Sequence, residues 1–357
     1  MSGIFIIAEA GVNHNGSLEL ARRLVEIAAE AGADAVKFQT FKAENLVSAK
    51  APKALYQMQT TAASESQYDM LKKLELDESA HAALIDDCAA RGIQFLSTPF
   101  DLESLDLLVT RFQISRIKLS SGEVTNAPLL LRTAQYGRPV ILSTGMSTIE
   151  EIETALGILA FGYMQESERP ALKDFQRAYR SEAGQSALKE KVVLLHCTTE
   201  YPAPFEDTHL LAMDTMRSTF ALPVGFSDHT TGIAISIAAA ARGAAIIEKH
   251  FTLDKSMPGP DHRASLEPDA LKAMVASIRQ VEAALGSSRK TPSVSEMRNR
   301  DVVRKSLVAA RDIQKGETLT EINIAVKRPG TGVSPLYYWD RLGIRAGRDY
   351  HEDEMIE

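Results

Sequence analysis

The chain is poor in cysteine and tryptophan and carries no excess of positive charge. Its 357 residues include two cysteines, Cys88 and Cys197, and one tryptophan. Two cysteines cannot build a disulfide framework, and these two lack the spacing of a zinc motif, so a reducing, cytoplasmic setting is expected. The 40 basic and 47 acidic residues give a formal charge of −7, which argues against non-specific binding of nucleic acid.

Long hydrophobic runs and several common catalytic signatures are also missing. No apolar stretch reaches the roughly 18 residues of a membrane span, and the N-terminal segment has neither the basic leader nor the apolar length of a signal peptide. GxGxxG, P-loop and GxSxG patterns do not follow the apolar runs, which argues against dinucleotide-binding, P-loop and hydrolase folds. The remaining composition, 45% hydrophobic and 24% charged, is that of an ordinary globular protein.

Eight short apolar runs alternate with amphipathic segments along most of the chain. Continuous apolarity over six or seven residues is typical of strands that are buried on both faces, as in parallel sheets. Eight such strands separated by helices predict a (β/α)₈ barrel, and a doubly wound open sheet is the alternative. The expected strands occupy residues 4–9, 34–39, 93–99, 116–121, 139–144, 192–197, 222–228 and 245–251.

Helical periodicity is clearest in segments 17–33, 78–93 and 147–160. Ser17 is the expected N-cap of the first, and residues 147–150 (Ser-Thr-Ile-Glu) are the expected capping box of the third. Two long connections, 40–77 and 162–190, interrupt the rhythm, and the first is expected to contribute to a lid.

The pattern changes near Gly286, which predicts three parts of the chain. Residues 1–285 are expected to form the catalytic barrel, 286–303 a polar linker, and 304–357 a small β-rich domain. A unit of about 50 residues is marginal as an independent core, so this last part is expected to dock on a larger unit.

Polar or ionisable groups end every expected strand, and in a barrel these ends converge on one site. Lys37 and Lys118, expected on neighbouring strands among several Ser and Thr hydroxyls, predict a phosphate site. Strand-edge lysines that reach solvent are the alternative. Cys197 is expected to be a buried structural thiol, because it points away from the face of its neighbour His196.

Two histidines about one βα unit apart predict a metal site. His229 and His250 are expected at the ends of adjacent strands, and Glu248 shares the parity of His250. Two imidazoles with carboxylates, including Asp261, suit Mn²⁺ or Mg²⁺ better than structural zinc. Helix-capping or core histidines are the alternative.

These residues lie in motifs that resemble those of the bacterial sialic acid synthases, the phosphoenolpyruvate-dependent enzymes that make nonulosonic acids. The resemblance spans the whole chain, and the motifs together are highly specific. They are IAEAGVNHNG (7–16), GADAVKFQT (32–40), FLSTPFD (95–101), KLSSGE (118–123), LSTGM (142–146), LLHCTTEYPAPFED (194–207), GFSDHT (225–230), EKHFT (248–252), PGPDH (258–262) and segments of 305–332.

The resemblance implies a TIM barrel followed by an antifreeze-like (SAF) domain. It implies a domain-swapped homodimer in which each small domain covers the barrel mouth of its partner. The implied reaction in carbohydrate biosynthesis condenses phosphoenolpyruvate with an N-acetylmannosamine-type sugar and releases phosphate by C–O cleavage, with a divalent metal, Mn²⁺ or Mg²⁺, as Lewis acid.

The same resemblance implies a role for each matching residue. The metal ligands are His229 and His250, and Arg328 reaches the sugar's N-acetyl group from the other subunit. Thr199 stands where some family members have Asn. The phosphoenolpyruvate site comprises Lys37, Thr98, Lys118, Ser121, Ser143 and Ser227, and the acceptor or metal-bound waters contact Glu9, Tyr201, Glu248 and Asp261.

Four residues are expected to be catalytic: Glu9, Lys118, Glu123 and Glu248. Glu123 is the candidate for proton handling, and Gln39 and Thr199 complete the expected substrate contacts. The segment 56–76 is expected to tune the sugar pocket.

Three functions are carried forward. The leading one is N-acetylneuraminate synthase. The close alternative is N,N'-diacetyllegionaminate synthase, which uses 2,4-diacetamido-2,4,6-trideoxymannose. A non-catalytic carbohydrate-binding protein is less favoured, because binding alone does not need the set of Lys, His and Glu at the strand ends.

Overall fold

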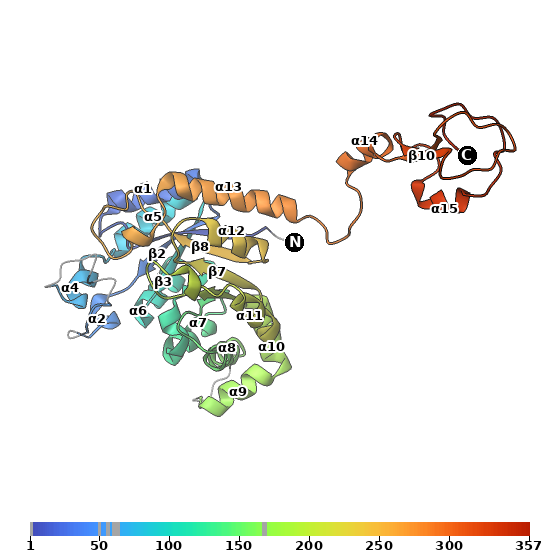
Figure 1. The fold of residues 1–357 in the computed structure, drawn as a ribbon. Helices are drawn as coiled ribbons and strands as arrows, with labels where there is room; N and C mark the ends of the chain where they lie inside the picture. Colours follow the sequence, from blue (N-terminus) through green and yellow to red (C-terminus); the bar gives the residue numbers. More distant parts are fainter. Residues whose placement is uncertain (1–2, 49–50, 55–57, 59–64, 166–169) are drawn as a thin grey trace. The chain divides into compact units, whose positions relative to one another are not determined.

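Figure 1 shows a computed structural model of the chain, which describes residues 3–48, 51–54, 58, 65–165 and 170–357. The chain divides into two compact units, Met1–Gly286 and Ser287–Glu357, and each is described by itself. None of the helices in the described residues combines the length and apolarity that crossing a membrane requires.

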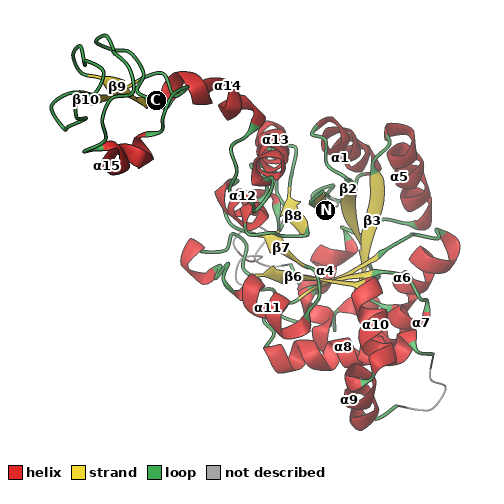
Figure 2. Ribbon diagram, turned by 90° about the vertical axis from the view of Figure 1, so that its right-hand side faces the viewer, coloured by secondary structure: helices red, strands yellow, loops and turns green. Residues whose placement is uncertain are grey.

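The first unit is a barrel of eight parallel strands covered by helices (Figure 2). The hydrogen-bonded order is β3-β2-β1-β8-β7-β6-β5-β4, so β1 lies between β2 and β8, and β3 packs beside β4. This arrangement confirms the predicted barrel and excludes the open sheet. The strands are β1 (Phe5–Gly11), β2 (Ala35–Thr40), β3 (Gln94–Pro99), β4 (Ile117–Leu119), β5 (Val140–Ser143), β6 (Val192–Cys197), β7 (Val224–Asp228) and β8 (Ile246–His250).

A layer of apolar side chains fills the barrel interior below its mouth. Gly225 makes room for this layer, because a Cβ there would lie 2.6 Å from Leu195 Cδ2 and 2.5 Å from the carbonyl oxygen of Ile246. Burying side chains of this size contributes about 1.5–3 kcal/mol each. The layer comprises Ile7, Ala35, Leu96, Ile141, Leu195 and Ile246.

Helices on the outside pack their apolar faces against the strands. The three helices with the clearest periodicity are confirmed as α1 (Leu18–Glu30), α5 (Glu78–Arg91) and α8 (Ile149–Tyr163), and Ser17 caps the first. The remaining helices of this unit are α2 (Ala43–Leu46), α4 (Gln67–Lys72), α6 (Leu102–Asp106), α7 (Ala127–Gln135), α9 (Leu172–Arg180), α10 (Glu182–Lys191), α11 (Ala212–Phe220), α12 (Ala234–Ala241) and α13 (Pro268–Leu285), with short turns η1 (Leu107–Arg111), η2 (Ser121–Thr125), η3 (Phe205–Asp207) and η4 (His262–Ala264).

The capping box predicted at residues 147–150 was wrong by one residue. Thr148 is the N-cap: its hydroxyl accepts from the Glu151 amide at 3.3 Å, and the Glu151 carboxylate accepts from the Thr148 amide at 2.8 Å. Ser147 instead donates to the carbonyl oxygen of Gly145. The turn that follows β5 therefore uses the first hydroxyl, and the helix uses the second.

The second unit is small and β-rich. Strand β9 (Ser306–Ala309) pairs antiparallel with β10 (Ile324–Lys327), followed by η5 (Pro335–Tyr337) and α15 (Tyr338–Arg341). Its core comprises Leu307, Ala309, Ile313, Leu319, Ile324, Ala346, Tyr350 and Ile356.

The predicted linker is not irregular throughout. Helix α14 (Val294–Val303) occupies its second half, begun by a capping box between Ser293 and Glu296, and has no buried residue. Few apolar positions follow helical spacing there, so the sequence signal for a helix was weak.

Candidate active site

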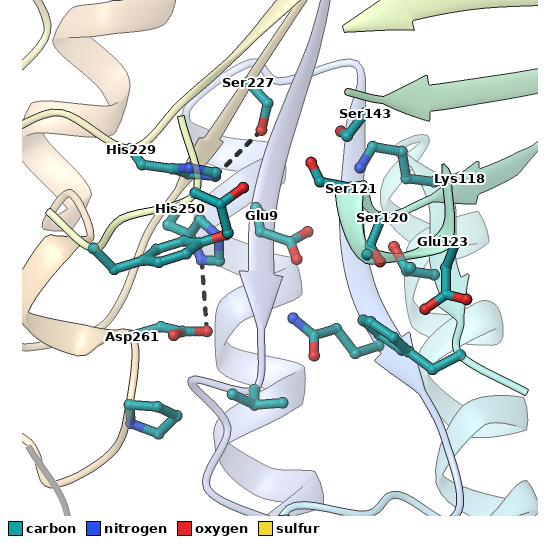
Figure 3. A pocket seen from close by; sticks show the side chains of 18 of the residues that line it. Glu9, Lys118, Ser120, Ser121, Glu123, Ser143, Ser227, His229, His250 and Asp261 are labelled. Atoms are coloured by element: carbon teal, nitrogen blue, oxygen red, sulfur yellow. Dashed lines mark hydrogen bonds and ion pairs between the residues drawn. The ribbon is translucent and has the colours of Figure 1, made fainter. Parts of the chain in front are cut away.

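A cavity of about 370 Å³ opens where the carboxyl ends of the barrel strands meet. Every predicted site residue of the first unit lines it. Figure 3 shows the imidazoles and Asp261 on one side of the space and Lys118 with Ser120, Ser121, Ser143 and Glu123 on the other. The predicted residues in its lining are Glu9, Lys37, Gln39, Thr98, Lys118, Ser121, Glu123, Ser143, Thr199, Tyr201, Ser227, His229, Glu248, His250 and Asp261.

Arg328 lies in the second unit, and its role toward a partner subunit stays a prediction. Its guanidinium Nε donates to the carbonyl oxygen of Val303 at 3.0 Å, and its side chain is exposed.

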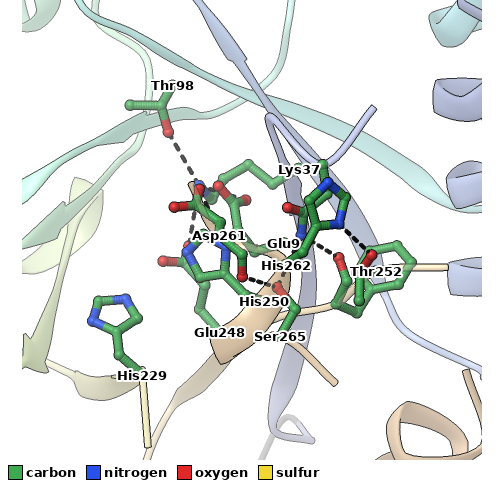
Figure 4. A network of polar contacts seen from close by, with 12 residues as sticks. Glu9, Lys37, Thr98, His229, Glu248, His250, Thr252, Asp261, His262 and Ser265 are labelled. Atoms are coloured by element: carbon green, nitrogen blue, oxygen red, sulfur yellow. Dashed lines mark hydrogen bonds and ion pairs between the residues drawn. The ribbon is translucent and has the colours of Figure 1, made fainter. Parts of the chain in front are cut away.

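Two lysines meet at one carboxylate in the centre of the cavity. Lys37 Nζ lies 2.7 Å from Glu9 Oε2 and 3.6 Å from Glu248 Oε2, and Lys118 Nζ lies 3.3 Å from Glu248 Oε1. The prediction that the lysines lie on neighbouring strands was wrong, because β3 separates β2 from β4. They converge across the mouth of the barrel (Figure 4 draws the Lys37 side).

The two carboxyl groups that contact Lys37, those of Glu9 and Glu248, have widely different pKa values. Burial raises the pKa of Glu9 to about 7 against the opposing charge of Lys37. Burial also disfavours ionisation of Glu248, but Lys118 and Lys37 hold its pKa at about 2, with help from the Ser227 hydroxyl, which donates to Glu248 at 2.8 Å. Near neutral pH one carboxyl is therefore a fixed anion and the other is ready to exchange a proton.

Hydroxyl groups beside Lys118 lack internal partners. Ser143 Oγ and Thr199 Oγ1 are buried and accept or donate no hydrogen bond within the described part of the chain. Ser121 Oγ accepts from the Gly145 amide at 2.9 Å and lies 3.1 Å from Cys197 Sγ. Buried hydroxyls without partners are costly unless a ligand pairs with them, so this group suits an oxyanion.

Gly145 closes this group of hydroxyls from one side. A Cβ at that position would lie 2.3 Å from Thr199 Oγ1 and 2.9 Å from Ser121 Oγ. Cys197 is buried as predicted, and burial raises the pKa of its thiol, but it also lines the cavity. The thiol is therefore part of the site wall.

Both predicted metal ligands present neutral imidazoles. Burial lowers the pKa of His229 to about 4 and that of His250 well below its usual value. His229 Nδ1 donates to the carbonyl oxygen of Thr198 at 2.6 Å, which leaves the Nε2 lone pair toward the cavity. The two ring centroids lie 5.6 Å apart, and the Tyr201 ring lies 4.2 Å from that of His229.

The acidic group beside the imidazoles is Asp261. Its Oδ2 atom lies 3.9 Å from His250 Nδ1, which is buried and has no hydrogen-bond partner within the described residues. Burial raises the pKa of Asp261 to about 6. An orphaned imidazole nitrogen beside carboxylates fits a divalent cation. No three His, Cys, Asp or Glu side chains converge as a complete ligand set in residues 3–48, 51–54, 58, 65–165 and 170–357, so remaining positions would fall to substrate or water.

Comparison with known proteins identifies the family. The model of the NeuB family matches residues 24–290, and that of the SAF domain matches residues 304–356. The chain belongs to the NeuB family. The expected resemblance to sialic acid synthases is thereby confirmed, as are the barrel with a C-terminal SAF domain and the assignment as a nonulosonic acid synthase.

Two relatives and one solved structure illustrate the likeness. N,N'-diacetyllegionaminic acid synthase of Campylobacter jejuni is 51% identical over 356 residues, covering 100% of this chain and 99% of that protein. The enzyme of the same name from Legionella pneumophila is 46% identical, covering 96% and 90%. The crystal structure of N-acetylneuraminic acid synthetase from Leptospira borgpetersenii, in complex with citrate, has a TM-score of 0.66 at 31% identity, covering 84% and 90%.

Asn13, which was not among the predicted site residues, joins two loops at the mouth of the NeuB barrel. Asn13 Nδ2 donates to the carbonyl oxygen of Phe251 at 2.8 Å and to Ser265 Oγ at 2.9 Å. Ser265 in turn donates to the carbonyl oxygen of Asp261 at 2.7 Å (Figure 4). The loop after β1 thus fixes the loop that carries Asp261.

Part of the cavity is lined by apolar side chains, of which Met70, Leu71 and Leu74 fall in the segment expected to tune the sugar pocket and the others were not predicted. These side chains follow the first three strands and carry no strand-end polarity, so the search for ionisable groups passed over them. Of the segment 56–76, expected to tune the sugar pocket, residues 58 and 65–76 are described, and 56, 57 and 59–64 lie outside the described residues. The apolar lining includes Val12, Leu46, Val47, Met70, Leu71, Leu74 and Phe100.

Proposed function

We propose that this NeuB-family enzyme is an N,N'-diacetyllegionaminate synthase. It condenses phosphoenolpyruvate with 2,4-diacetamido-2,4,6-trideoxymannose and releases phosphate by C–O cleavage. The observation that carries the proposal is 51% identity along the whole chain to an N,N'-diacetyllegionaminic acid synthase. The two free cysteines fit a reducing cytoplasmic setting.

N-acetylneuraminate synthase, the function that the sequence analysis placed first, has weaker support. The likeness to a solved N-acetylneuraminic acid synthetase stands at 31% identity, against 51% and 46% for the two legionaminic acid synthases. Sugar choice can change within one fold through a few pocket contacts, so direct comparison of the two sugars is required.

The phosphate of phosphoenolpyruvate is assigned to the unpartnered hydroxyls. Ser143 and Thr199 offer two donors, and Lys118 on the adjacent strand neutralises the anion. Lys37 and Thr98, joined by a 3.2 Å hydrogen bond, would extend the cationic wall toward the rest of the ligand. Ser121 and Ser227 complete the polar lining.

A divalent cation, Mn²⁺ or Mg²⁺, is assigned to His229 and His250. The family is generally metal-dependent, and the neutral imidazoles and orphaned His250 Nδ1 fit such an ion. When bound, the cation polarises the aldehyde of the open-chain sugar. In this proposal Glu9, Tyr201, Glu248 and Asp261, which line the cavity, contact the sugar or bound water.

The chain's own residues then serve each stage of the reaction. Carbon 3 of phosphoenolpyruvate attacks the aldehyde carbon, and the cationic centre that develops at carbon 2 is captured by water. The resulting tetrahedral species expels phosphate, whose charge the buried Lys118 and Lys37 stabilise. Burial raises the pKa of the Glu123 carboxyl. Glu123 is therefore the candidate to move the proton that the adding water gives up.

A domain-swapped homodimer is part of the proposal, with Arg328 of each chain serving the other's cavity. Mixing an Arg328→Ala variant with a His229→Ala variant, after mild dissociation and reassociation, would create dimers with one intact site. Recovered activity would support the swap, and two inactive parents that stay inactive as proven mixed dimers would argue against it.

Phosphate release from phosphoenolpyruvate with Mn²⁺ tests the function. The diacetamido sugar and N-acetylmannosamine are compared in parallel, with His229→Ala as the control. Higher kcat/KM with the diacetamido sugar is expected. Higher kcat/KM with N-acetylmannosamine would reassign the enzyme as a sialic acid synthase, and no release with either would refute the proposed reaction.

A further inference from the structure

We infer that one apolar wall of the cavity selects an acceptor sugar with a methyl group, rather than a hydroxymethyl group, at its carbon 5. The inference rests on the proposed function and names the part of the site that chooses the sugar. The apolar wall consists of Val12, Leu46, Val47, Met70, Leu71, Leu74 and Phe100.

The cavity is divided by the strands that supply its side chains. The cationic and hydroxyl groups come from β2 and from the ends of β3 to β7, and the imidazoles from β7 and β8. The apolar wall comes from the segments that follow β1, β2 and β3: Val12 directly after β1, α2 and α4 after β2, and Phe100 directly after β3. One side of the mouth is thus chemically unlike the other.

The apolar wall is packed rather than loosely arranged. Val12, Met70 and Leu74 form one buried cluster with Phe41, and Leu46, Leu71 and Phe100 pack against it. The rings of Phe41 and Phe100 meet edge to face with centroids 6.2 Å apart. Val47 lines the cavity beside this cluster. A packed wall presents a fixed apolar surface, and its side chains carry no strong hydrogen-bonding group for a hydroxyl.

The reacting end of the sugar fixes which end meets the apolar wall. The aldehyde carbon must lie beside the central lysines, carboxylates and imidazoles, because the bond forms there. The far end of the six-carbon chain then extends away from these groups. Gln39 and Gln67 also line the cavity, and their amides suit the acetamido groups, whereas the apolar wall suits a methyl.

The physical preference follows from desolvation. A terminal hydroxyl against apolar side chains loses its hydrogen bonds to water without replacement, and a methyl group gains from burial. An apolar pocket discriminates by roughly 10- to 100-fold against an added hydroxyl. The preference is therefore expected in affinity as well as in turnover.

The experiment uses two sugars that differ only at carbon 6. These are 2,4-diacetamido-2,4,6-trideoxymannose and its 6-hydroxy counterpart, 2,4-diacetamido-2,4-dideoxymannose. Affinity is measured by calorimetry and kcat/KM by phosphate release, on the full-length enzyme with Mn²⁺. The variants are Val47→Thr, which adds a hydroxyl at nearly constant volume, and Leu71→Asn. The matched control is Lys72→Gln, the exposed neighbour of Leu71 on α4, which is outside the cavity lining.

Wild-type enzyme is expected to favour the 6-deoxy sugar by about tenfold or more in both measurements. Val47→Thr or Leu71→Asn should reduce that ratio at least threefold, and Lys72→Gln should retain it. Equal affinity of the wild type for both sugars would overturn the inference while leaving the proposed function intact if phosphate is still released. Absence of release alone would refute the proposed function, and the affinity ratio would then decide the apolar wall by itself.

Discussion

Glu248 receives contacts from three elements of the barrel at once. Lys37 on β2, Lys118 on β4 and Ser227 on β7 all reach its carboxylate. This carboxylate offsets part of the charge of the two lysines, so the mouth of the barrel does not carry two uncompensated buried cations. An incoming anion must therefore compete with Glu248 for Lys118.

Glu123→Gln is expected to lower kcat by roughly 10²–10⁴ while the KM for phosphoenolpyruvate stays within about threefold. Burial raises the pKa of the Glu123 carboxyl against the opposing effect of Asn126, which donates a hydrogen bond to it at 2.6 Å. The glutamine side chain keeps the shape of the glutamate but cannot take up and release the proton. Steady-state phosphate release is the measurement. Glu103→Gln, an exposed carboxylate on α6, is the control, and wild-type turnover in Glu123→Gln would remove the residue from proton transfer.

At the residue scale, the sequence predicted what strand periodicity controls. Glu248 and His250 share a parity, and both face the cavity. Asn13 and the wall residues outside segment 56–76 escaped prediction, because their positions are set by loops that meet only after folding. Apolar side chains at such positions are the ordinary content of a protein core, so they carry no signal of a site.

At the element scale, the start of α8 depends on one of two adjacent hydroxyls. Thr148→Ala should lower the free energy of unfolding by about 1 kcal/mol, because the Glu151 amide loses its acceptor. Ser147→Ala is the matched control and should cost less, since that hydroxyl bonds only the Gly145 carbonyl in the described residues. Urea unfolding of both variants compares them, and an equal or larger loss for Ser147→Ala would contradict the assigned cap.

Strands β7 and β8 are joined on their outer side by a fully buried ion pair. Lys249 Nζ lies 3.1 Å from Asp228 Oδ2, and Asp228 also accepts from Thr230 and Ser236. Lys249→Met should destabilise the barrel by about 3–5 kcal/mol, because it leaves a buried carboxylate without its cation. The loss is measured by denaturant unfolding, monitored with a signal that reports on the barrel unit alone.

The control for this pair is Lys272→Met on the exposed face of α13, where a change within about 0.5 kcal/mol is expected. A similar small change for Lys249→Met would mean that the pair contributes little beyond its packing.

The strands were predicted well, because their apolar burial is continuous. Features that depend on contacts between elements were predicted less well. All eight strands lie within three residues of their expected bounds, because strands buried on both faces have an unmistakable composition. Strand adjacency was wrong for Lys37 and Lys118, since sequence order alone does not show that two side chains meet across a barrel. Helix α14 was missed because it buries none of its residues, so no apolar face marks it in the sequence.

At the scale of the whole molecule, acid sensitivity should follow its buried neutral histidines. Burial lowers the pKa of His14 to about 4, against 6.5 in the unfolded chain. Between those values the unfolded chain binds more protons, so the free energy of unfolding falls as the pH falls. Glu9 and Asp261 act in the opposite direction, because their pKa values are raised in the folded chain.

Comparing the free energy of unfolding of His14→Asn and the wild type at several pH values isolates the contribution of His14 to acid sensitivity. In the wild type the Gly16 amide donates a hydrogen bond to His14 Nδ1 at 3.0 Å, and the side-chain oxygen of asparagine can accept the same bond. Between pH 7 and pH 5 the wild type should lose up to about 2 kcal/mol more than the variant in urea unfolding. Parallel pH curves for the wild type and His14→Asn would disprove a neutral buried His14.

The architecture of the molecule was accessible from the sequence because two independent signals agreed. Apolar periodicity predicted the barrel, and the motifs carried the resemblance to sialic acid synthases. The sequence left two acceptor sugars open, because the polar residues expected at the strand ends do not distinguish between them.

The barrel has a seam. The hydrogen-bonded ladder begins at β3 and ends at β4, and within residues 94–119, all of which are described, no ladder joins the two. Strand β4 is three residues long and pairs with β5 alone, whereas β1 is paired on both sides. Local breathing should start at such an edge, so the amides of Ile117–Leu119 are expected to take up deuterium before those of Phe5–Gly11, as mass spectrometry of labelled peptides can show. Because Lys118 lies on this edge, the cation that the proposal assigns to phosphate is carried by a strand with one hydrogen-bonded neighbour.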